Sequence, residues 1–209
     1  MQEFFETKAN YADKTVLVMK NIEQEKIAME YPNIKINYQD TPEKFRKAAD
    51  EIISYLIENL LVLNKIEEEC SQLNEYQKRG IRIKGKPKDF DGIWTLYRTR
   101  YGEAVSSFCT DKLVARGYAQ SMRGPRRVVA PDGTLIEEKI YGKYAYLNYG
   151  CELTITMKSN KRAVVEISYV DKDHLNRLRC FTLVNNDKWQ LTDIKHKFHE
   201  DDKWKSDNL

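Results

Sequence analysis

The sequence predicts an α+β fold in which helices cover one face of a curved antiparallel sheet. Two observations predict it. The last third of the chain holds four short runs in which apolar and polar residues alternate, and the middle holds two long stretches with apolar residues at helical spacing. Because one face of a sheet must be covered by other elements, the upstream helices are expected to pack on the strands and form a cone with them.

The four runs between residues 149 and 198 predict consecutive strands of one meander. In the second run, Val165, Ile167 and Tyr169 share one face, which is the pattern of a half-buried strand. The segment 185–187 (Asn-Asn-Asp) predicts a tight turn, since Asn and Asp tolerate the positive φ of hairpin loops. Beyond these strands the tail is polar except for Trp204, which we expect to fold back on the sheet. The predicted strands are 151–157, 161–169, 177–184 and 189–195.

A long amphipathic helix is predicted from about Pro42 to about Lys78. Asp40 or Thr41 can cap its first turn, and Gly80 is a typical residue after a helix end. The sequence leaves open whether this helix is interrupted near residue 59. The spacing also fits a dimerising coiled coil, but packing on the protein's own core is favoured. The apolar positions are Phe45, Ala49, Ile52, Leu56, Leu63, Ile66, Cys70 and Leu73.

Residues 90–116 predict a further helix with an aromatic stripe, which is more typical of a core than of a ligand cage. Between Tyr118 and Tyr149, turn signals such as 131–133 (Pro-Asp-Gly) predict a hairpin. The first forty residues favour a helix, with a strand at 16–19 as the alternative. We therefore divide the chain into an N-terminal helical segment, residues 1–85, and an α+β domain, residues 86–209. The stripe comprises Trp94, Tyr97, Tyr101, Val105, Phe108 and Leu113.

Composition excludes several classes of function. The net charge is only +3, whereas nucleic-acid binding normally needs a clustered basic face, so no nucleic-acid partner is expected. The sequence contains no apolar stretch of about 18 residues and no basic-then-apolar leader at its start, so we expect no membrane partner. The four cysteines are far apart, which favours free thiols in a reducing cytoplasm over disulfides.

Motifs for metals, cofactors and nucleophilic catalysis are not found in the sequence. The glycines are too sparse for a phosphate-binding loop, and Lys84-Gly85-Lys86 lacks the strand and the helix that flank such a loop. His196 and His199 have no cysteine pair near them, so we expect no metal site. The sequence also lacks a Gly-x-Ser-x-Gly elbow. We therefore expect neither a cofactor nor enzymatic activity.

One segment carries a family resemblance. Residues 181–194 (FTLVNNDKWQLTDI) combine an apolar strand, a polar turn and a Trp-led strand, and in this they resemble the last hairpin of the nuclear transport factor two-like superfamily. Within that superfamily, residues 97–101, 108–112 and 142–144 are similar to immunity proteins of bacterial polymorphic toxin systems. The resemblance implies a cytoplasmic protein that binds the toxin domain of a cognate effector and blocks it.

A protein that acts by binding needs an interface with aromatic and arginine anchors inside a polar rim. Such residues are numerous on and beside the predicted hairpin, where loops usually carry small polar residues. The alternative is that the tyrosines line the sheet and the arginines are only solvated. The candidate partner-binding residues are Tyr118, Arg123, Arg126, Arg127, Tyr141, Tyr144 and Tyr146.

Two other classes of function stay open. The superfamily includes isomerases and dehydratases, which use a carboxylate or histidine base inside the cone, and Asp193, His174 and the tyrosines of residues 141–149 are the candidates for that chemistry. A scaffold built on the long helix is the other alternative. A filled interior favours binding, whereas a solvent-connected pocket with a buried carboxylate favours catalysis.

Overall fold

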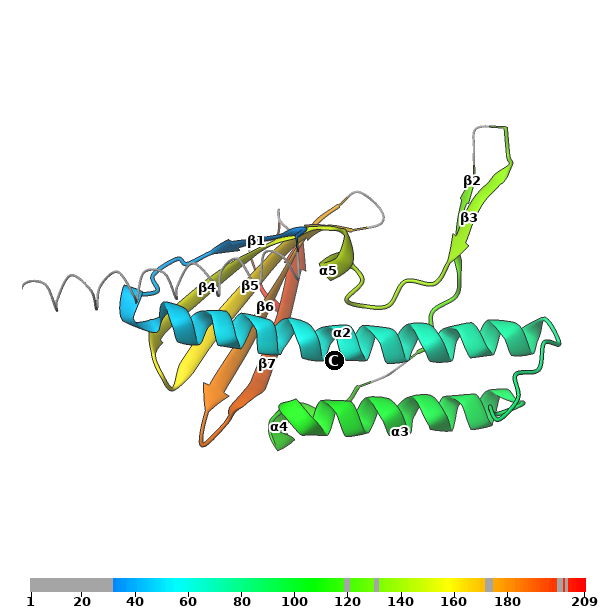
Figure 1. The fold of residues 1–209 in the computed structure, drawn as a ribbon, viewed down its shortest axis with the longest axis horizontal. Coiled ribbons are helices and arrows are strands. Elements are labelled where there is room, and N and C mark those ends of the chain that lie inside the picture. Colours follow the sequence, from blue (N-terminus) through cyan, green and yellow to red (C-terminus); the bar gives the residue numbers. More distant parts are fainter. Residues whose placement is uncertain (1–31, 119–120, 130–131, 172–174, 199–200, 202) are drawn as a thin grey trace, which may run out of the picture.

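The computed structural model describes residues 32–118, 121–129, 132–171, 175–198, 201 and 203–209. These residues form both helices and strands, so the fold is α+β (Figure 1). The elements are β1 (Ile34–Asn37), a 3-10 turn (Glu43–Phe45), α2 (Arg46–Lys78), α3 (Phe90–Phe108), α4 (Asp111–Val114), β2 (Arg126–Val129), β3 (Leu135–Lys139), α5 (Tyr146–Tyr149), β4 (Cys151–Ser159), β5 (Arg162–Val170), β6 (Asn176–Asn185), β7 (Trp189–Phe198) and β8 (Lys205–Ser206).

The large sheet has six strands in the order β1-β4-β5-β6-β7-β8, and it is open at both edges. The meander from β4 to β7 confirms the four predicted strands, and Asp187 has the positive φ, 119°, that the predicted turn requires. The expectation of a purely antiparallel sheet is wrong. β1 pairs with β4 in parallel, with Ile34 opposite Cys151, so the sheet is mixed.

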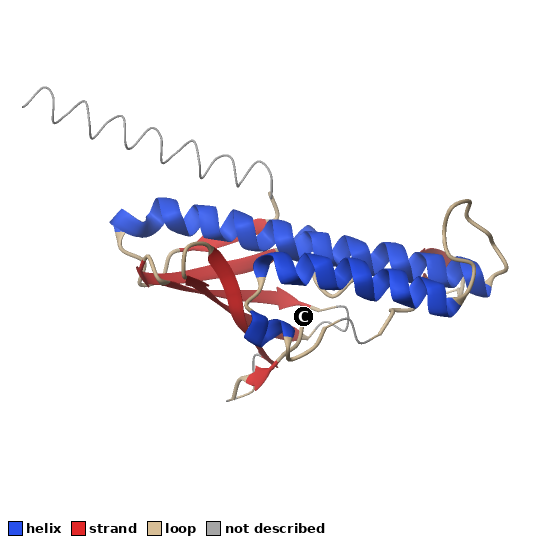
Figure 2. Ribbon diagram, turned by 90° about the horizontal axis from the view of Figure 1, so that it is seen from below, coloured by secondary structure: helices blue, strands red, loops and turns tan. Residues whose placement is uncertain are grey.

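The helices form a layer on one face of this sheet. α2 runs across the strands and α3 lies beside it, as both views show (Figures 1 and 2). One continuous core lies between the layers, and it takes Ile53 and Leu60 from α2, Tyr101 from α3, and Ile155 and Phe181 from the sheet. The division at residue 85 stays a prediction, and this core contains side chains from both sides of it.

α2 is continuous from Arg46 to Lys78, so the interruption considered near residue 59 is absent from it. The Asn59 side chain donates to the carbonyl of Tyr55, one turn back, at 2.7 Å, and the helix continues past it. The predicted cap is also wrong, because the turn before α2 has no side-chain cap. Thr41 is instead bound to β4: its hydroxyl donates to the carbonyl of Ile155 at 2.9 Å and accepts from the amide of Met157 at 3.0 Å.

The stretch predicted as one helix over residues 90–116 is divided in two. α3 ends at Phe108, and Cys109 and Thr110 are extended. The amide of Thr110 donates to the carbonyl of Leu191 at 2.9 Å, so this segment runs along the outer edge of β7. The contact with β7 brings α4 to that edge of the sheet.

The hairpin predicted between Tyr118 and Tyr149 is present as β2 and β3. The two strands form a separate two-stranded sheet, in which Arg126 is opposite Lys139. They project from the body of the molecule as an arm (Figure 1). We refer to β2 and β3 as the arm.

The N-terminal region is only partly described. The expected helix and its alternative, a strand at 16–19, lie outside the described residues. The strand β1 at residues 34–37 was not predicted. Its Ile34 is buried at the sheet edge, whereas Lys35 is exposed, so the alternation that marks a strand spans only four residues.

All four cysteines are free, as the sequence analysis expected. Burial raises the pKa of the Cys151 thiol to about 12 and that of Cys180 to about 11. Thiols with such pKa values are poor nucleophiles at neutral pH, which fits a packing role. Of the helices that the structure describes, none has the length and apolarity needed to span a bilayer.

Candidate functional site

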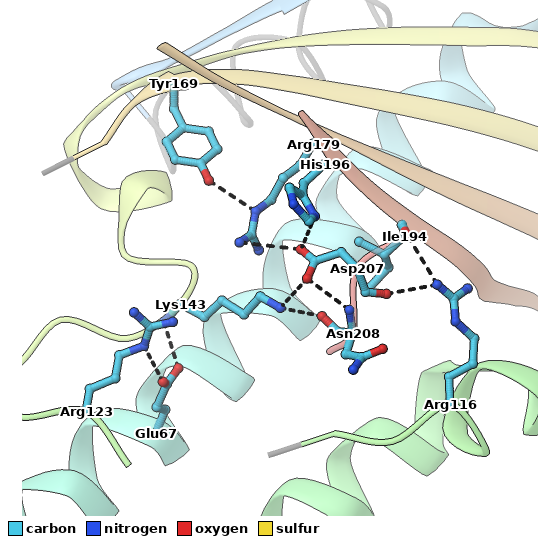
Figure 3. Close-up of polar contacts among 10 residues, drawn as sticks. All are labelled: Glu67, Arg116, Arg123, Lys143, Tyr169, Arg179, Ile194, His196, Asp207 and Asn208. Carbon is cyan, nitrogen blue, oxygen red and sulfur yellow. Dashed lines mark hydrogen bonds and ion pairs between the residues drawn. The ribbon is translucent and has the colours of Figure 1, made fainter. Parts of the chain in front are cut away.

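A cluster of charged side chains lies between the helices and the C-terminal part of the sheet (Figure 3). Its centre is the carboxylate of Asp207. One oxygen accepts from Lys143 Nζ at 3.0 Å, and the other lies 3.5 Å from Arg179 Nη2 and 3.8 Å from His196 Nδ1. The three basic groups come from the loop before α5, from β6 and from β7. We call these four residues the Asp207 cluster.

Arg179 belongs to the inner face of β6, and only 13% of its side chain is exposed. Its Nε donates to the hydroxyl of Tyr169 at 3.1 Å, and its guanidinium lies 5.4 Å and 5.9 Å from the ring centroids of Tyr144 and Tyr146. Aromatic faces attract a cation, and the Asp207 carboxylate supplies the opposite charge. Arg179 is therefore a structural cation of the interior.

Burial changes the protonation of the cluster. The loss of water around its ammonium, together with the positive charge of Arg179, lowers the pKa of Lys143 to about 8. Burial alone would raise the pKa of Asp207, but the charges of Arg179 and Lys143 outweigh that effect and hold the pKa below its ordinary value. At neutral pH the cluster therefore contains an ionised carboxylate and a charged lysine.

Lys143 is placed in the cluster by the polar face of α2. The amide of Lys143 donates to Glu67 at 2.7 Å, and the next amide, of Tyr144, donates to the side chain of Asn64 at 3.0 Å. Gly142 donates to Glu68 at 3.1 Å. Since Asn64 and Glu67 are buried, these hydrogen bonds replace the bonds to water that their side chains lose on folding.

The chain segment after β8 closes the cluster from outside. The amide of Asp207 donates to the carbonyl of Ile194 at 2.9 Å, and Arg116 Nη2 donates to the carbonyl of Asp207 at 3.0 Å. Leu209 is buried in the core. Trp204 lies against Lys197 of β7, with the ammonium 5.2 Å from its ring centroid, so it folds back as expected. However, Asp207 and Leu209 are the residues that enter the interior.

Large side chains are buried between the helices and the sheet of the described fold. Tyr101, Tyr144, Phe108 and Phe181 are among its largest fully buried residues. Two hollows open to the surface. One, of about 500 Å³, lies beside Thr41 and Lys158, and another, of about 340 Å³, lies between α4 and the sheet. Neither hollow has a residue of the Asp207 cluster in its lining.

The predicted partner-binding residues occupy different environments. Tyr144 and Tyr146 are buried, and Tyr146 stacks on Tyr169 with ring centroids 3.8 Å apart. A buried ring is not available to a partner, so these two are corrected to core residues. Tyr118 is half-buried and stacks on Tyr101 with 6.1 Å between centroids. Arg123 forms an ion pair with Glu67 at 2.6 Å, which ties its loop to α2.

The remaining candidates gather at the arm. Arg126 is exposed on β2 and opposite Lys139, Arg127 is the next residue of the strand, and Tyr141 follows β3. Sequence reasoning missed Lys139, and it named Tyr149 only as a candidate for catalysis. Lys139 Nζ lies 5.6 Å and 5.8 Å from the ring centroids of Tyr141 and Tyr149, and Tyr149 is 59% exposed. The density of tyrosines over residues 141–149 was the available signal for Tyr149. We call Arg126, Lys139, Tyr141 and Tyr149 the arm-base surface.

The residues considered for catalysis can be placed only in part. Asp193 lies on β7 and forms an ion pair with Arg116 at 2.5 Å, outside the Asp207 cluster. His174 lies outside the described residues. Among the residues that can be placed, no group of three or more histidine, cysteine, aspartate or glutamate side chains has the arrangement of a metal site.

Comparisons with known proteins give no relative: no protein-family model, no curated protein and no solved structure matches this chain. The function is therefore argued from the geometry of the arm and of the interior.

Proposed function

We propose that this chain is an immunity protein that binds the toxin domain of a cognate bacterial effector in the cytoplasm and blocks it by direct contact. It performs no chemistry of its own. Its fold is of the nuclear transport factor two-like type, with β1 as an added edge strand. The observation that carries the proposal is the arm, which projects from the body of the molecule and has Lys139, Tyr141 and Tyr149 together at its base.

The large side chains buried between the helices and the sheet favour binding over catalysis. An isomerase or dehydratase of this superfamily needs room for a substrate between the helices and the sheet, with a base exposed to it. Here that space is taken by Tyr101, Tyr144 and Phe181, and the carboxylate nearest to it, that of Asp207, is bound by Lys143 and Arg179. A carboxylate held by two cations has a lowered pKa and is a weak base.

The arm-base surface supplies the kind of residues that anchor protein interfaces. Tyrosine and arginine are enriched at interface hot spots, because each combines a large contact area with hydrogen bonding. Tyr141 and Tyr149 pack against each other with ring centroids 5.6 Å apart, and Lys139 lies near both rings. The two rings therefore lie together and offer one aromatic surface to a partner.

The charge of this surface indicates the charge of its partner. Arg126 and Lys139 are opposite each other in the strand register, whereas the next residue, Arg127, is opposite Glu138. Cations that are close together favour a partner with carboxylates at the matching positions, and such complementarity increases the association rate. We therefore propose that the toxin domain presents an acidic surface to the arm.

Neutralisation in living cells tests this proposal. Bacteria would express the candidate toxin domain encoded next to the gene for this chain, alone or together with the chain. We expect growth arrest with the toxin alone and survival with both proteins. Arrest in both cultures, with both proteins present in the lysate, would contradict the proposal.

A control separates binding from enzymatic detoxification. The purified chain and toxin domain would be mixed and separated by size-exclusion chromatography. We expect one complex that contains both proteins in a fixed ratio. Protection at a chain concentration far below that of the toxin, without a complex, would indicate turnover and would contradict the proposal.

A further inference from the structure

A second basic site lies away from the arm, in the hollow between α4 and the outer face of the sheet. From the geometry of this hollow we propose that it is a binding site for a phosphate-type oxyanion. The hollow has a volume of about 340 Å³. Its lining comes from α4 and the residues after it, and from β5, β6 and β7. The lining residues are Lys112, Arg116, Arg162, Thr182, Val184, Thr192, Asp193 and Lys195.

The hollow has an excess of positive charge. Four of its side chains are cations, whereas Asp193 is the only carboxylate in its lining. Asp193 is already shared, since it lies 2.5 Å from Arg116 and 3.6 Å from Lys195. Within the described residues, no ion pair neutralises Lys112 or Arg162. These two cations come from α4 and from β5, so they face the hollow from different elements and favour an anion between them.

Arg116 is held in position before any ligand binds. Its Nη1 donates to Asp193 at 2.5 Å, and its Nη2 donates to the carbonyls of Asp207 at 3.0 Å and Ile194 at 3.5 Å. Three acceptors fix the plane of the guanidinium, and these bonds do not use the Nε proton or the second Nη1 proton of this lining residue. Guanidinium groups match the geometry of phosphate oxygens, and a fixed one loses little entropy when it binds.

Two hydroxyl groups complete the lining. Thr182 of β6 and Thr192 of β7 lie in the floor of the hollow, and the hydroxyl of Thr192 accepts from that of Thr110 at 3.4 Å. That contact leaves the proton of Thr192 to donate elsewhere. Hydroxyl donors beside Arg and Lys are the usual partners of a phosphate group, since its three terminal oxygens accept several hydrogen bonds.

Titration of the whole protein tests this site. Inorganic phosphate and methyl phosphate would be added at constant ionic strength, and the backbone amide signals of Thr182 and Thr192 would be followed by NMR. We expect saturable shifts with both probes. A tighter response to methyl phosphate would indicate that the natural ligand is a phosphate ester, and an equal response would indicate free phosphate.

Charge reversal supplies the matched control. Lys112→Glu and Arg162→Glu should each weaken phosphate binding at least about tenfold, while Arg162→Lys should keep most of it. Lys35→Glu makes the same change of charge on β1, the opposite edge strand of the sheet, and should change binding less than about twofold. Thermal unfolding would confirm that each variant is folded.

Three results would overturn the inference. These are shifts that do not saturate, an equal loss in Lys35→Glu, and a stronger response to hexaglutamate than to phosphate. The last result would assign the hollow to an acidic protein partner. Because these titrations contain no toxin, their failure would leave the proposed function of the arm unaffected.

Discussion

The ammonium nitrogen of Lys143 lies 3.0 Å from the carboxylate of Asp207, although 64 positions separate the two residues. This contact joins the loop before α5 to the segment after β8, and Arg179 binds the same carboxylate from β6. A single aspartate therefore connects three parts of the chain at the point where the helices meet the sheet. We expect removal of this carboxylate to lower the stability of the fold more than it weakens the binding of a partner.

The first prediction concerns Asp207→Asn. At pH 7 the variant should have a free energy of unfolding lower by about 2 kcal/mol, which is typical of a hydrogen bond to a charged group. The pKa of Asp207 is lowered in the folded protein, so this stabilisation is complete above the ordinary carboxyl pKa and is lost as the pH falls through the lowered value.

Urea unfolding of the natural chain and of Asp207→Asn at pH 7 and pH 2.5 checks this. The difference between the two proteins should shrink at the lower pH. An equal difference at both pH values would show that the carboxylate charge is not what stabilises the fold.

The second prediction concerns the pKa of Lys143, which burial lowers to about 8. NMR of its side-chain carbon next to the amine should follow a titration near pH 8, while exposed lysines titrate near their ordinary value of about 10.4. Asp207 favours the charged amine, so Asp207→Asn should lower the pKa of Lys143 further. If Lys143 titrated at the same pH as the exposed lysines, this result would contradict its burial.

The third prediction concerns Gly142, which lies against α2. A Cβ atom here would lie 2.9 Å from the backbone carbonyl oxygen of Asn64 and would also meet its side chain. Gly142→Ala should therefore cost about 1 to 3 kcal/mol, as is typical when atoms are added to a packed site. Gly124→Ala is the control, because a Cβ there would meet no atom within 4 Å. Similar melting temperatures for both variants would disagree with this packing.

The fourth prediction concerns Thr41, whose hydroxyl bonds to Ile155 and Met157 of β4. Thr41→Val keeps the shape of the side chain and removes both bonds, so it should lower the free energy of unfolding by about 1 to 3 kcal/mol, the cost of a buried unsatisfied group. Thr41→Ser keeps the hydroxyl and should lose less. If Thr41 acted as a helix cap instead, the loss would appear as fraying at the start of α2, measurable by amide exchange.

The sequence predicted the meander well, because periodicity reports burial on one face and each of these strands spans at least nine residues. β1 has four residues, too few for alternation to stand out, and its parallel pairing with β4 depends on contacts 117 positions away, as between Ile34 and Cys151. Thr41 precedes a helix, which predicts a cap, but in the fold its hydroxyl bonds to the backbone of β4, more than 110 positions away in the sequence.

The candidate site was harder to predict than the fold. The sequence alone does not show whether a tyrosine is buried in the core or exposed to a partner, so it does not separate Tyr144 from Tyr141. Burial separates them: Tyr144 is fully buried, and Tyr141 lies with Tyr149 and Lys139 at the base of the arm. The Asp207 cluster was missed because its members are isolated charges in the sequence, brought together only by the fold.

Calorimetric titration of the isolated toxin domain into Arg126→Glu/Arg127→Glu tests the central proposal most directly. Lys35→Glu/Lys158→Glu is the matched control, since it reverses two exposed lysines on β1 and β4, away from the arm (Figure 1). The arm variant should bind at least about tenfold more weakly than the natural chain, and the control should bind as tightly. Equal affinities of the arm variant and the natural chain would contradict the arm as the contact surface.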